Sequence, residues 1–233
     1  MTAENQIDLF NLSTALDASP LSIDPEQIPI DAKVPIPIGT YATMDAMKAH
    51  CNHCYRCELG HTRTNAVVGE GNLSADIMIV GEGPGQTEDA TGRPFVGRSG
   101  ELLDKILAAV RLTRDQDVFI CNVVKCRPPE NRDPKPAEAA ACKGYLLEQI
   151  RLVDPKIILL TGKVALLNLL GIKQGITKVR GQWIEQDGRL YMPIFHPAYL
   201  LRNQSREVGQ PKWLMWQDVQ SVRAKLDELR GLG

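Results

Sequence analysis

The chain has 233 residues, of which 43% are apolar and 24% are charged, and its formal net charge is −1. This composition is typical of a globular protein with one domain of ordinary size. No stretch approaches the roughly 20 apolar residues of a membrane span, and the first ten residues lack the basic and apolar regions of a secretory signal. We therefore expect a cytoplasmic protein that has no membrane partner.

The first 40 residues differ from the rest of the chain. They contain five prolines and one aromatic residue, Phe10, and carry a net charge of −5, which leaves +4 for residues 41–233. We expect residues 1–40 to form a flexible acidic tail and residues 41–233 to form one globular domain. A mildly basic domain permits a polyanionic partner but does not require one.

Short apolar runs alternate with segments of helical period through the rest of the chain. A helix is expected first, over residues 41–50. The strands are expected over residues 75–80, 117–124, 156–161 and 191–195. Further helices are expected over residues 100–110, 136–150, 164–170 and 212–229. This alternation predicts an α/β fold, a three-layer α/β/α sandwich around a mostly parallel four-stranded sheet.

Three segments follow the carboxyl ends of predicted strands. They are the GEGPG turn over residues 81–85, Asn122 and His196. Ligands of such sheets bind beyond these strand ends, so we expect the three segments to form one site. The GEGPG turn matches neither a dinucleotide-binding nor a phosphate-binding loop, but its glycines permit close approach to a flat ligand.

Three longer motifs carry a resemblance to a known family. They are GEGPGQTEDATGRPFVGRSGELL (81–103), NVVKCRPPENRDP (122–134) and HPAYLLRN (196–203). All three resemble the motifs of family 4 uracil-DNA glycosylases, and the similarity runs from about Cys54 to the C-terminus. It implies a monofunctional enzyme of base-excision repair that flips uracil out of DNA and hydrolyses its N-glycosidic bond, leaving an abasic site.

The resemblance implies a role for each residue of the base pocket. Phe95 would stack on the flipped uracil. The Asn122 amide would pair with N3–H and O4, a pattern that cytosine presents in reverse. His196 would donate a hydrogen bond to O2 of the leaving base. The complete set expected to bind the substrate is Gly81, Glu82, Gly83, Phe95, Asn122 and His196.

The expected catalytic residues are Glu82, Asn122 and His196, and one point of the mechanism stays open. Family 1 uracil glycosylases carry an aspartate, usually assigned to the attacking water, where this chain has Gly83. Glu82 is the nearby carboxylate. It would orient the water, stabilise cationic character on the sugar, or only bind the base.

The resemblance also predicts the contacts with DNA. Leu200 stands where the superfamily inserts an apolar wedge into the space left by the flipped base. Arg202, Arg180 and Lys178 are candidates for phosphate contacts. The expected partner is uracil-containing DNA, single- or double-stranded, bound by a monomer.

Six cysteines in a cytoplasmic chain are unsuited to disulfides. Cys54 and Cys57 form one pair, and Cys126 and Cys142 form a second. This spacing fits zinc or an iron–sulfur cluster equally well. The family resemblance implies a structural [4Fe–4S] cluster with these four ligands, while Cys51, three positions before Cys54, competes as a ligand. The sixth cysteine, Cys121, is expected to pack inside a strand.

Two other functions remain open from the sequence. The first is a glycosylase of the same superfamily that acts mainly on another deaminated base, hypoxanthine or xanthine. The second is a non-catalytic DNA-binding module with a metal cluster. Asn122 favours uracil, and the presence of both Asn122 and His196 argues against a non-catalytic module.

The tail carries a motif that the glycosylase resemblance does not explain. Residues 6–10 read QIDLF, which is similar to the short peptide by which bacterial polymerases and repair proteins bind the sliding clamp. Leu9 and Phe10 would fill an apolar pocket, and Gln6 would form a hydrogen bond at a second point. A weak, micromolar-class interaction with the clamp is therefore expected.

Overall fold

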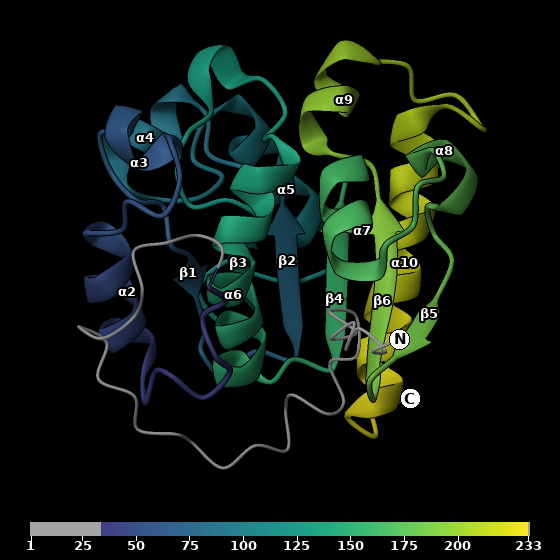
Figure 1. Cartoon of the computed structure of the whole chain (residues 1–233). Coiled ribbons are helices and arrows are strands. Elements are labelled where there is room, and N and C mark those ends of the chain that lie inside the picture. Colours follow the sequence, from purple (N-terminus) through teal and green to yellow (C-terminus); the bar gives the residue numbers. More distant parts are fainter. Residues whose placement is uncertain (1–33, 233) are drawn as a thin grey trace, which may run out of the picture.

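The structure, a computed structural model, describes residues 34–232 and contains a twisted six-stranded sheet between helices (Figure 1). The strand order is β1-β3-β2-β4-β6-β5. The four central strands run parallel. They are β2 (Ile77–Gly81), β3 (Val118–Asn122), β4 (Ile157–Thr161) and β6 (Arg189–Ile194). These strands coincide with the four predicted runs, and the predicted fold class is confirmed.

Two short strands extend the sheet at its edges. β1 (Glu70–Gly71) pairs antiparallel with β3, and β5 (Ile184–Gln186) pairs antiparallel with β6. The sequence analysis did not predict either strand, because two or three residues are too few to establish an alternating pattern. Both edges lie away from the strand ends that build the site.

The five long predicted helices are present with small shifts of their ends. They are α2 (Met44–Asn52), α5 (Arg98–Ala109), α6 (Pro136–Val153), α7 (Lys163–Leu170) and α10 (Pro211–Leu229). Five further turns of helix were not predicted: α3 (Leu59–Thr62), α4 (Gln86–Thr91), η2 (Pro129–Asn131), α8 (Ile176–Val179) and α9 (Pro197–Arg202). Within the described residues no helix combines the length and the apolar character needed to cross a membrane.

Two apolar cores lie on opposite faces of the sheet because successive side chains of a strand point to opposite faces. On β2, Met78 and Val80 join the core that α2, α6 and α7 cover. Ile77 and Ile79 join the other core, with α5, α9 and α10. All five residues of β2, β3 and β4 are buried. Helices on both faces therefore give the three layers seen in Figure 1.

Packed structure begins before α2. Ile36 is buried, and a Cβ atom on Gly144 of α6 would lie 2.6 Å from its Cβ. The fully buried Glu148 carboxylate accepts hydrogen bonds from the Gly39 N–H (2.7 Å) and the Tyr41 N–H (3.0 Å). Residues 36–40 thus already contact the domain, ahead of the boundary expected at residue 41. Residues 1–33, with the clamp-like motif, lie outside the described residues.

Candidate active site

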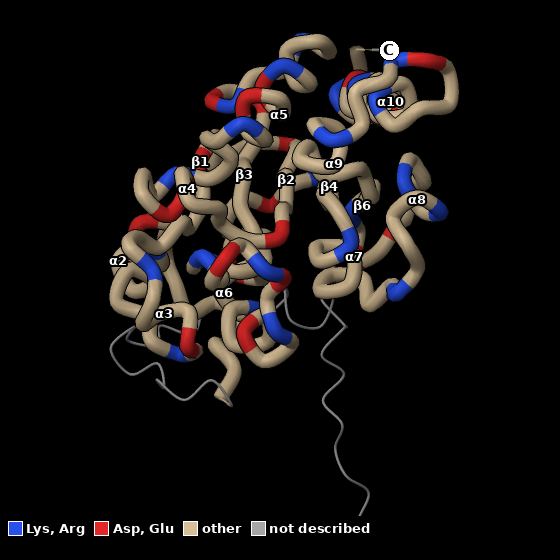
Figure 2. Tube along the Cα trace, turned by 90° about the horizontal axis from the view of Figure 1, so that it is seen from above, with Lys and Arg blue, Asp and Glu red and all other residues tan. Residues whose placement is uncertain are grey.

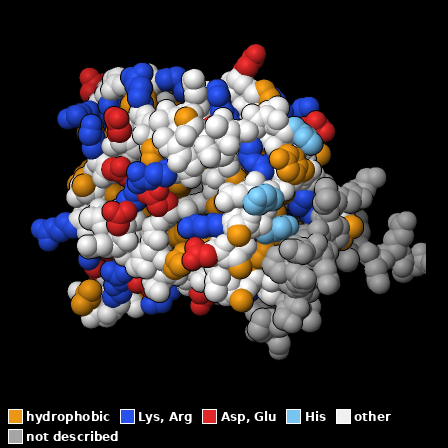
Figure 3. Space-filling view, turned by 90° about the vertical axis from the view of Figure 1, so that its left-hand side faces the viewer, with side chains coloured by type: hydrophobic (Ala, Val, Ile, Leu, Met, Phe, Trp, Pro, Cys, Tyr) orange, Lys and Arg blue, Asp and Glu red, His pale blue; other side chains and the backbone are white. Residues whose placement is uncertain are grey.

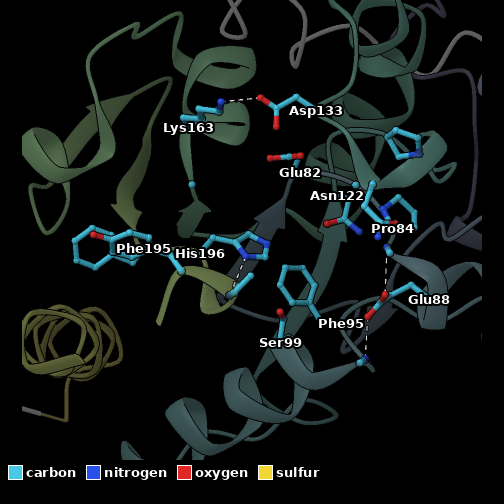
Figure 4. A pocket seen from close by; sticks show the side chains of 18 of the residues that line it. Glu82, Pro84, Glu88, Phe95, Ser99, Asn122, Asp133, Lys163, Phe195 and His196 are labelled. Atoms are coloured by element: carbon cyan, nitrogen blue, oxygen red, sulfur yellow. Dashed lines mark hydrogen bonds and ion pairs between the residues drawn. The ribbon is translucent and has the colours of Figure 1, made fainter. Parts of the chain in front are cut away.

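A pocket of about 960 Å³ opens at the carboxyl edge of the parallel strands (Figure 4). The three predicted segments meet there, contributing Glu82 after β2, Asn122 at the end of β3 and His196 after β6. The turn after β4 is a fourth contributor, through Gly162 and Lys163. The topology therefore assembles one site from all four parallel strands, as the rule for open α/β sheets predicts.

Gly81 lets the pocket residues approach one another. It is paired in register with Asn122 across β2 and β3. A Cβ atom at this position would lie 2.3 Å from Asn122 Oδ1 and 2.6 Å from Cζ of Phe95. No side chain fits at either distance, so only glycine brings the amide and the aromatic ring together here.

Phe95 is held in an unusual backbone conformation. Its φ of 50° lies in the left-handed region that non-glycine residues rarely adopt. The Arg114 guanidinium fixes this turn by donating to the carbonyl of Pro94 (2.8 Å) and to that of Phe95. The Phe95 ring faces the His196 ring, with centroids 5.7 Å apart and planes inclined by 29°. Strain of this kind occurs mainly at functional sites, and here it presents an aromatic face to the pocket.

The Asn122 side chain lines the pocket without a partner for its oxygen. Asn122 is only 2% exposed, and its Oδ1 accepts no hydrogen bond. A buried unsatisfied polar atom costs about 1–3 kcal/mol. A ligand with a donor opposite Oδ1 would recover that cost, so the amide is prepared to bind a polar group.

His196 is a neutral hydrogen-bond donor in this arrangement. Its Nδ1 accepts a hydrogen bond from the Ala198 N–H (3.1 Å) as α9 begins. The ring proton must therefore reside on Nε2. Burial lowers the pKa of His196 to about 4, and the positive charge of Arg202 acts in the same direction. At neutral pH the imidazole thus carries a single N–H, on Nε2.

Glu82 titrates near neutrality. Burial raises the pKa of this carboxyl to about 7, and the negative charge of Asp133 adds to the effect, while Lys163 opposes it. Lys163 and Asp133 form an ion pair of 2.6 Å beside Glu82 (Figure 4). A Cβ atom on Gly83 would lie 2.8 Å from Val124 Cγ2, so a side chain there would require Val124 to move. Glu82 is therefore the carboxylate that this turn offers.

The sequence analysis did not include Glu88 among the site residues. One oxygen of its carboxylate accepts hydrogen bonds from the Val96 N–H (3.0 Å) and the Gly97 N–H (2.9 Å). The other accepts from the Gly85 N–H (3.1 Å). Glu88 thus joins the GEGPG turn to the turn that carries Phe95. Both turns stand within one motif, so the capping position of Glu88, three residues after Gly85, was a usable signal.

Lysine and arginine positions occur on α5, α8 and α9 (Figure 2). Arg202 lines the pocket and Lys178 is exposed on α8, as a contact with phosphates requires. Arg98 also lines the pocket, at the first position of α5, and was not predicted. These three cations can reach a polyanion that lies across the pocket.

Two residues predicted to contact DNA, Leu200 and Arg180, have their side chains buried or paired within the protein. The Leu200 side chain is 1% exposed and belongs to the core beneath α9, so it is not placed to act as a wedge. Arg180 is bound within the protein, because its Nε donates to Asp218 Oδ2 (2.7 Å) and its guanidinium to the Leu214 carbonyl (3.0 Å). Leu200 was assigned from its position in a motif and Arg180 from its charge, and neither property reveals burial or internal pairing.

Histidine side chains lie together on the face of the molecule shown in Figure 3. Five cysteines, three of them within residues 51–57, lie close to one another. Burial raises the pKa of Cys126 to about 11, and the negative charges of Cys57 and Cys54 add to the shift. Burial likewise raises the pKa of Cys51, with contributions from Cys142, Cys54 and Cys126. The four predicted ligands and Cys51 are thus close enough to interact electrostatically. Cys121 is fully buried in β3, as predicted.

Several N–H groups point at these sulfurs. Arg63 donates to Cys126 Sγ (3.5 Å), Lys125 N–H donates to Cys142, and two N–H groups of α3 donate to Cys57. Such donors stabilise thiolates, the form of cysteine that binds metal. Among residues 34–232 no group of three or more His, Cys, Asp or Glu has the geometry to hold a single metal ion.

The sequence is similar to those of one family of known proteins. The profile of the Uracil DNA glycosylase superfamily matches residues 68–220, and the chain belongs to this superfamily. A type-4 uracil-DNA glycosylase of Thermotoga maritima is 48% identical over 78% of this chain and 93% of its own length. Its counterpart in Sulfurisphaera tokodaii is 45% identical over 69% and 77%, and that of Archaeoglobus fulgidus is 41% identical over 71% and 87%. Within the superfamily, the chain is a type-4 uracil-DNA glycosylase by family.

Proposed function

We propose that this protein hydrolyses the N-glycosidic bond of uracil in DNA and leaves an abasic site, acting as a monomer in the cytoplasm. The observation that carries the proposal is the unpartnered Asn122 amide at the end of β3, beside the facing rings of Phe95 and His196. Uracil offers N3–H to the free Oδ1 and O4 to the amide N–H, so it satisfies the buried asparagine. Family membership supports the same reaction.

The site residues divide the chemistry between the base and the sugar. As the glycosidic bond breaks, negative charge develops on uracil, and the Nε2–H of neutral His196 stabilises it at O2. Phe95 supports the flipped base from one face. Glu82, when ionised, attracts the cationic sugar and accepts a proton from the attacking water. Glu88 keeps the two turns that carry Glu82 and Phe95 in register.

A panel of modified bases tests the proposal. Oligonucleotides with uracil, hypoxanthine or thymine opposite guanine are incubated with the protein, and abasic sites are then cleaved with alkali. We expect cleavage at uracil and none at thymine, because a wall supplied by Glu82 or a nearby loop side chain would exclude the methyl group at C5. Faster release of hypoxanthine than of uracil would instead identify a glycosylase for another deaminated base, and no release of any base would identify a binding module.

Glu82→Gln is expected to change the pH dependence of both activity and stability. If the ionised carboxylate acts on the sugar, the parent rate rises as pH passes about 7, and the variant is slow and insensitive to pH in this range. The folded-state pKa lies above the unfolded value, so the stability contributed by protonated Glu82 is complete below about 4.5 and is lost as pH rises through about 7. The variant should therefore melt above the parent at pH 8 but not at pH 4.

Rate profiles and melting curves from pH 4 to 9 measure both effects. Glu101→Gln, a change of an exposed acid on α5, is the control and should alter neither. A Glu82→Gln variant with the parent's pH–rate profile would show that Glu82 only shapes the pocket.

We also propose that Cys54, Cys57, Cys126 and Cys142 hold a [4Fe–4S] cluster. This set of ligands fits such a cluster, because soft cysteine sulfurs lie close together and accept hydrogen bonds from N–H groups, and four thiolates suffice without a carboxylate. The four cysteines would hold the cluster through their thiolates, which would fix the cluster within the fold. The cluster would act as a structural tie between the segment after α2, the loop after β3 and α6.

Purified protein is expected to be brown, with broad absorption near roughly 400 nm from iron–thiolate bonds. Cys54→Ser and Cys142→Ser should each abolish this absorption. Cys51→Ser should preserve it if Cys51 stays outside the ligand set, and Cys121→Ser is the matched control. A colourless, active protein with one equivalent of zinc would contradict the proposal.

The QIDLF sequence at residues 6–10 supports a further partner, the bacterial sliding clamp. Leu9 and Phe10 offer adjacent apolar anchors, and Gln6 offers an amide. A labelled peptide of residues 1–20 should bind the clamp with micromolar-class affinity. Its counterpart with Leu9→Ala and Phe10→Ala should not, and equal binding of the two peptides would end this proposal.

A further inference from the structure

A buried ammonium group lies directly behind the base pocket. Lys125 follows β3, three residues after Asn122, and is 0% exposed. Lysine is almost never fully buried unless its charge is paired. Among residues 34–232, the hydrogen-bond acceptors of its Nζ are two neutral oxygens, the Asn122 carbonyl and Gln149 Oε1, each at 2.5 Å. Burial of a charged ammonium group costs desolvation free energy, so Lys125 is a candidate for a functional role in the adjoining pocket.

The contacts of Lys125 join three segments that are distant in sequence. Gln149 of α6, itself fully buried, passes the connection on by donating to the Val68 carbonyl (2.6 Å). The Lys125 carbonyl accepts from the Val67 N–H (2.7 Å), so the same segment is held twice. The Lys125 N–H donates to Cys142 of α6. One residue thus connects the end of β3, the segment before β1 and the cysteine set.

Asn122 depends on its backbone for its position. No hydrogen bond holds its Oδ1, so the direction of the amide follows from the orientation of the β3 end. The bond from Lys125 Nζ to the Asn122 carbonyl closes a short loop over residues 122–125 and fixes that orientation. On the same turn, the Val123 N–H donates to the Gly81 carbonyl (2.9 Å), which aligns the loop with the GEGPG turn.

We propose that Lys125 is the positioning residue for Asn122, and that its contact with Cys142 makes the ordering of the base pocket depend on whether the cysteines hold the cluster. The inference rests on the proposed function, since it assumes that Asn122 reads the base. Thiolates at the metal site supply negative charge close to the buried ammonium and stabilise it there. The ammonium in turn holds the carbonyl of the residue that contacts uracil.

Lys125→Met, which removes the charge and both hydrogen bonds at nearly constant volume, tests the positioning role. We expect the single-turnover excision rate at saturating enzyme to fall at least about tenfold, with little change in the Kd for DNA. Because the effect passes through Asn122, Lys125→Met should change the rate less than about twofold in an Asn122→Ala background. Lys125→Arg, which keeps a charged donor, should recover part of the parent rate.

The outcomes separate the inference from the function on which it rests. Failure of the parent to release uracil, or a parental rate for Asn122→Ala, would refute the proposed function or site. If the parent releases uracil and Asn122→Ala is slow, two results would refute the positioning role. One is an excision rate of Lys125→Met equal to that of the parent, and the other is the same fold-loss of rate when Lys125→Met is made in the parent and in Asn122→Ala. If Lys125→Met does not fold, Gln149→Met, which frees Nζ from its second acceptor, is expected to slow the parent but not Asn122→Ala, and equal losses would again refute it.

Absorption near roughly 400 nm supplies a readout that does not depend on activity. Lys125→Met protein should lose the iron–thiolate absorption faster than the parent during exposure to a chelator, since Cys142 loses its neighbouring charge. Thr161→Val, which removes a buried hydrogen bond to Val80 at the end of β4, is the matched control and should lose it at the parent rate. Equal rates for Lys125→Met and the parent would contradict the connection to the cysteine set.

Discussion

His196→Ala is expected to slow uracil excision by about a hundredfold or more while the protein stays folded. The variant loses the Nε2–H that, in the proposed mechanism, stabilises negative charge on the departing base, and removal of one such donor typically has an effect on this order. The fold should survive because the lost bond, from the Ala198 N–H to Nδ1, caps only the six-residue α9. Single-turnover kinetics and thermal melting measure the two effects.

The neutral state of His196 adds a second, independent expectation. Because the pKa of His196 is about 4, the excision rate of the Glu82→Gln variant should show no imidazole titration between pH 5 and 8. This variant is used because the carboxyl of Glu82 no longer contributes to the pH profile. A loss of rate with an apparent pKa near 6.5 in that background would mean that the imidazolium forms and that the assignment of the proton to Nε2 is wrong. His53→Ala, which changes an exposed histidine beyond α2, is the matched control and should leave the rate unchanged.

Asn122→Asp is expected to slow excision by a similar factor, on the order of a hundredfold. The carboxylate keeps the size of the amide but has no N–H for uracil O4. It also places a negative charge, at a position only 2% exposed, beside a base that becomes anionic. Both effects raise the energy of the transition state more than that of the bound substrate.

The matched control is Asn168→Asp, which changes an amide that donates within α7, to the Val164 carbonyl. It should excise uracil at the parent rate. An Asn122→Asp variant that is as fast as the parent would remove Asn122 from the list of catalytic residues. A variant that is slow only below saturation would assign Asn122 to binding alone.

Much of the fold follows from the sequence because β2, β3 and β4 are apolar up to their last residue, which is glycine, asparagine or threonine. Those ends share one edge of a parallel sheet, so the convergence of Glu82, Asn122 and His196 could be predicted from topology. Lys163 was harder to find, since Gly162 with φ of 91° turns the chain sharply after β4. The ion pair of Lys163 with Asp133 joins segments whose proximity no local pattern indicates.

Side-chain burial could not be predicted from the sequence at two of the residues expected to contact DNA. The motif position of Leu200 and the charge of Arg180 do not determine which side chains meet the core. Leu200 packs inward from α9, and Arg180 finds a buried carboxylate in Asp218 of α10. The left-handed backbone of Phe95 was equally hidden, because it depends on Arg114, which approaches from beyond α5.

The burial of the cysteines has a consequence for how the protein matures. Cys126 and Cys142 are 7% and 8% exposed, and both lie far along the chain from Cys54 and Cys57. Iron and sulfide delivered to the finished domain would have to enter through a transient opening of the segment around α2 and α3. For the proposed cluster, delivery during chain collapse, before these helices close, would avoid the need for such an opening. Recombinant yield of coloured protein should therefore depend on iron supply during synthesis more than on reconstitution afterwards.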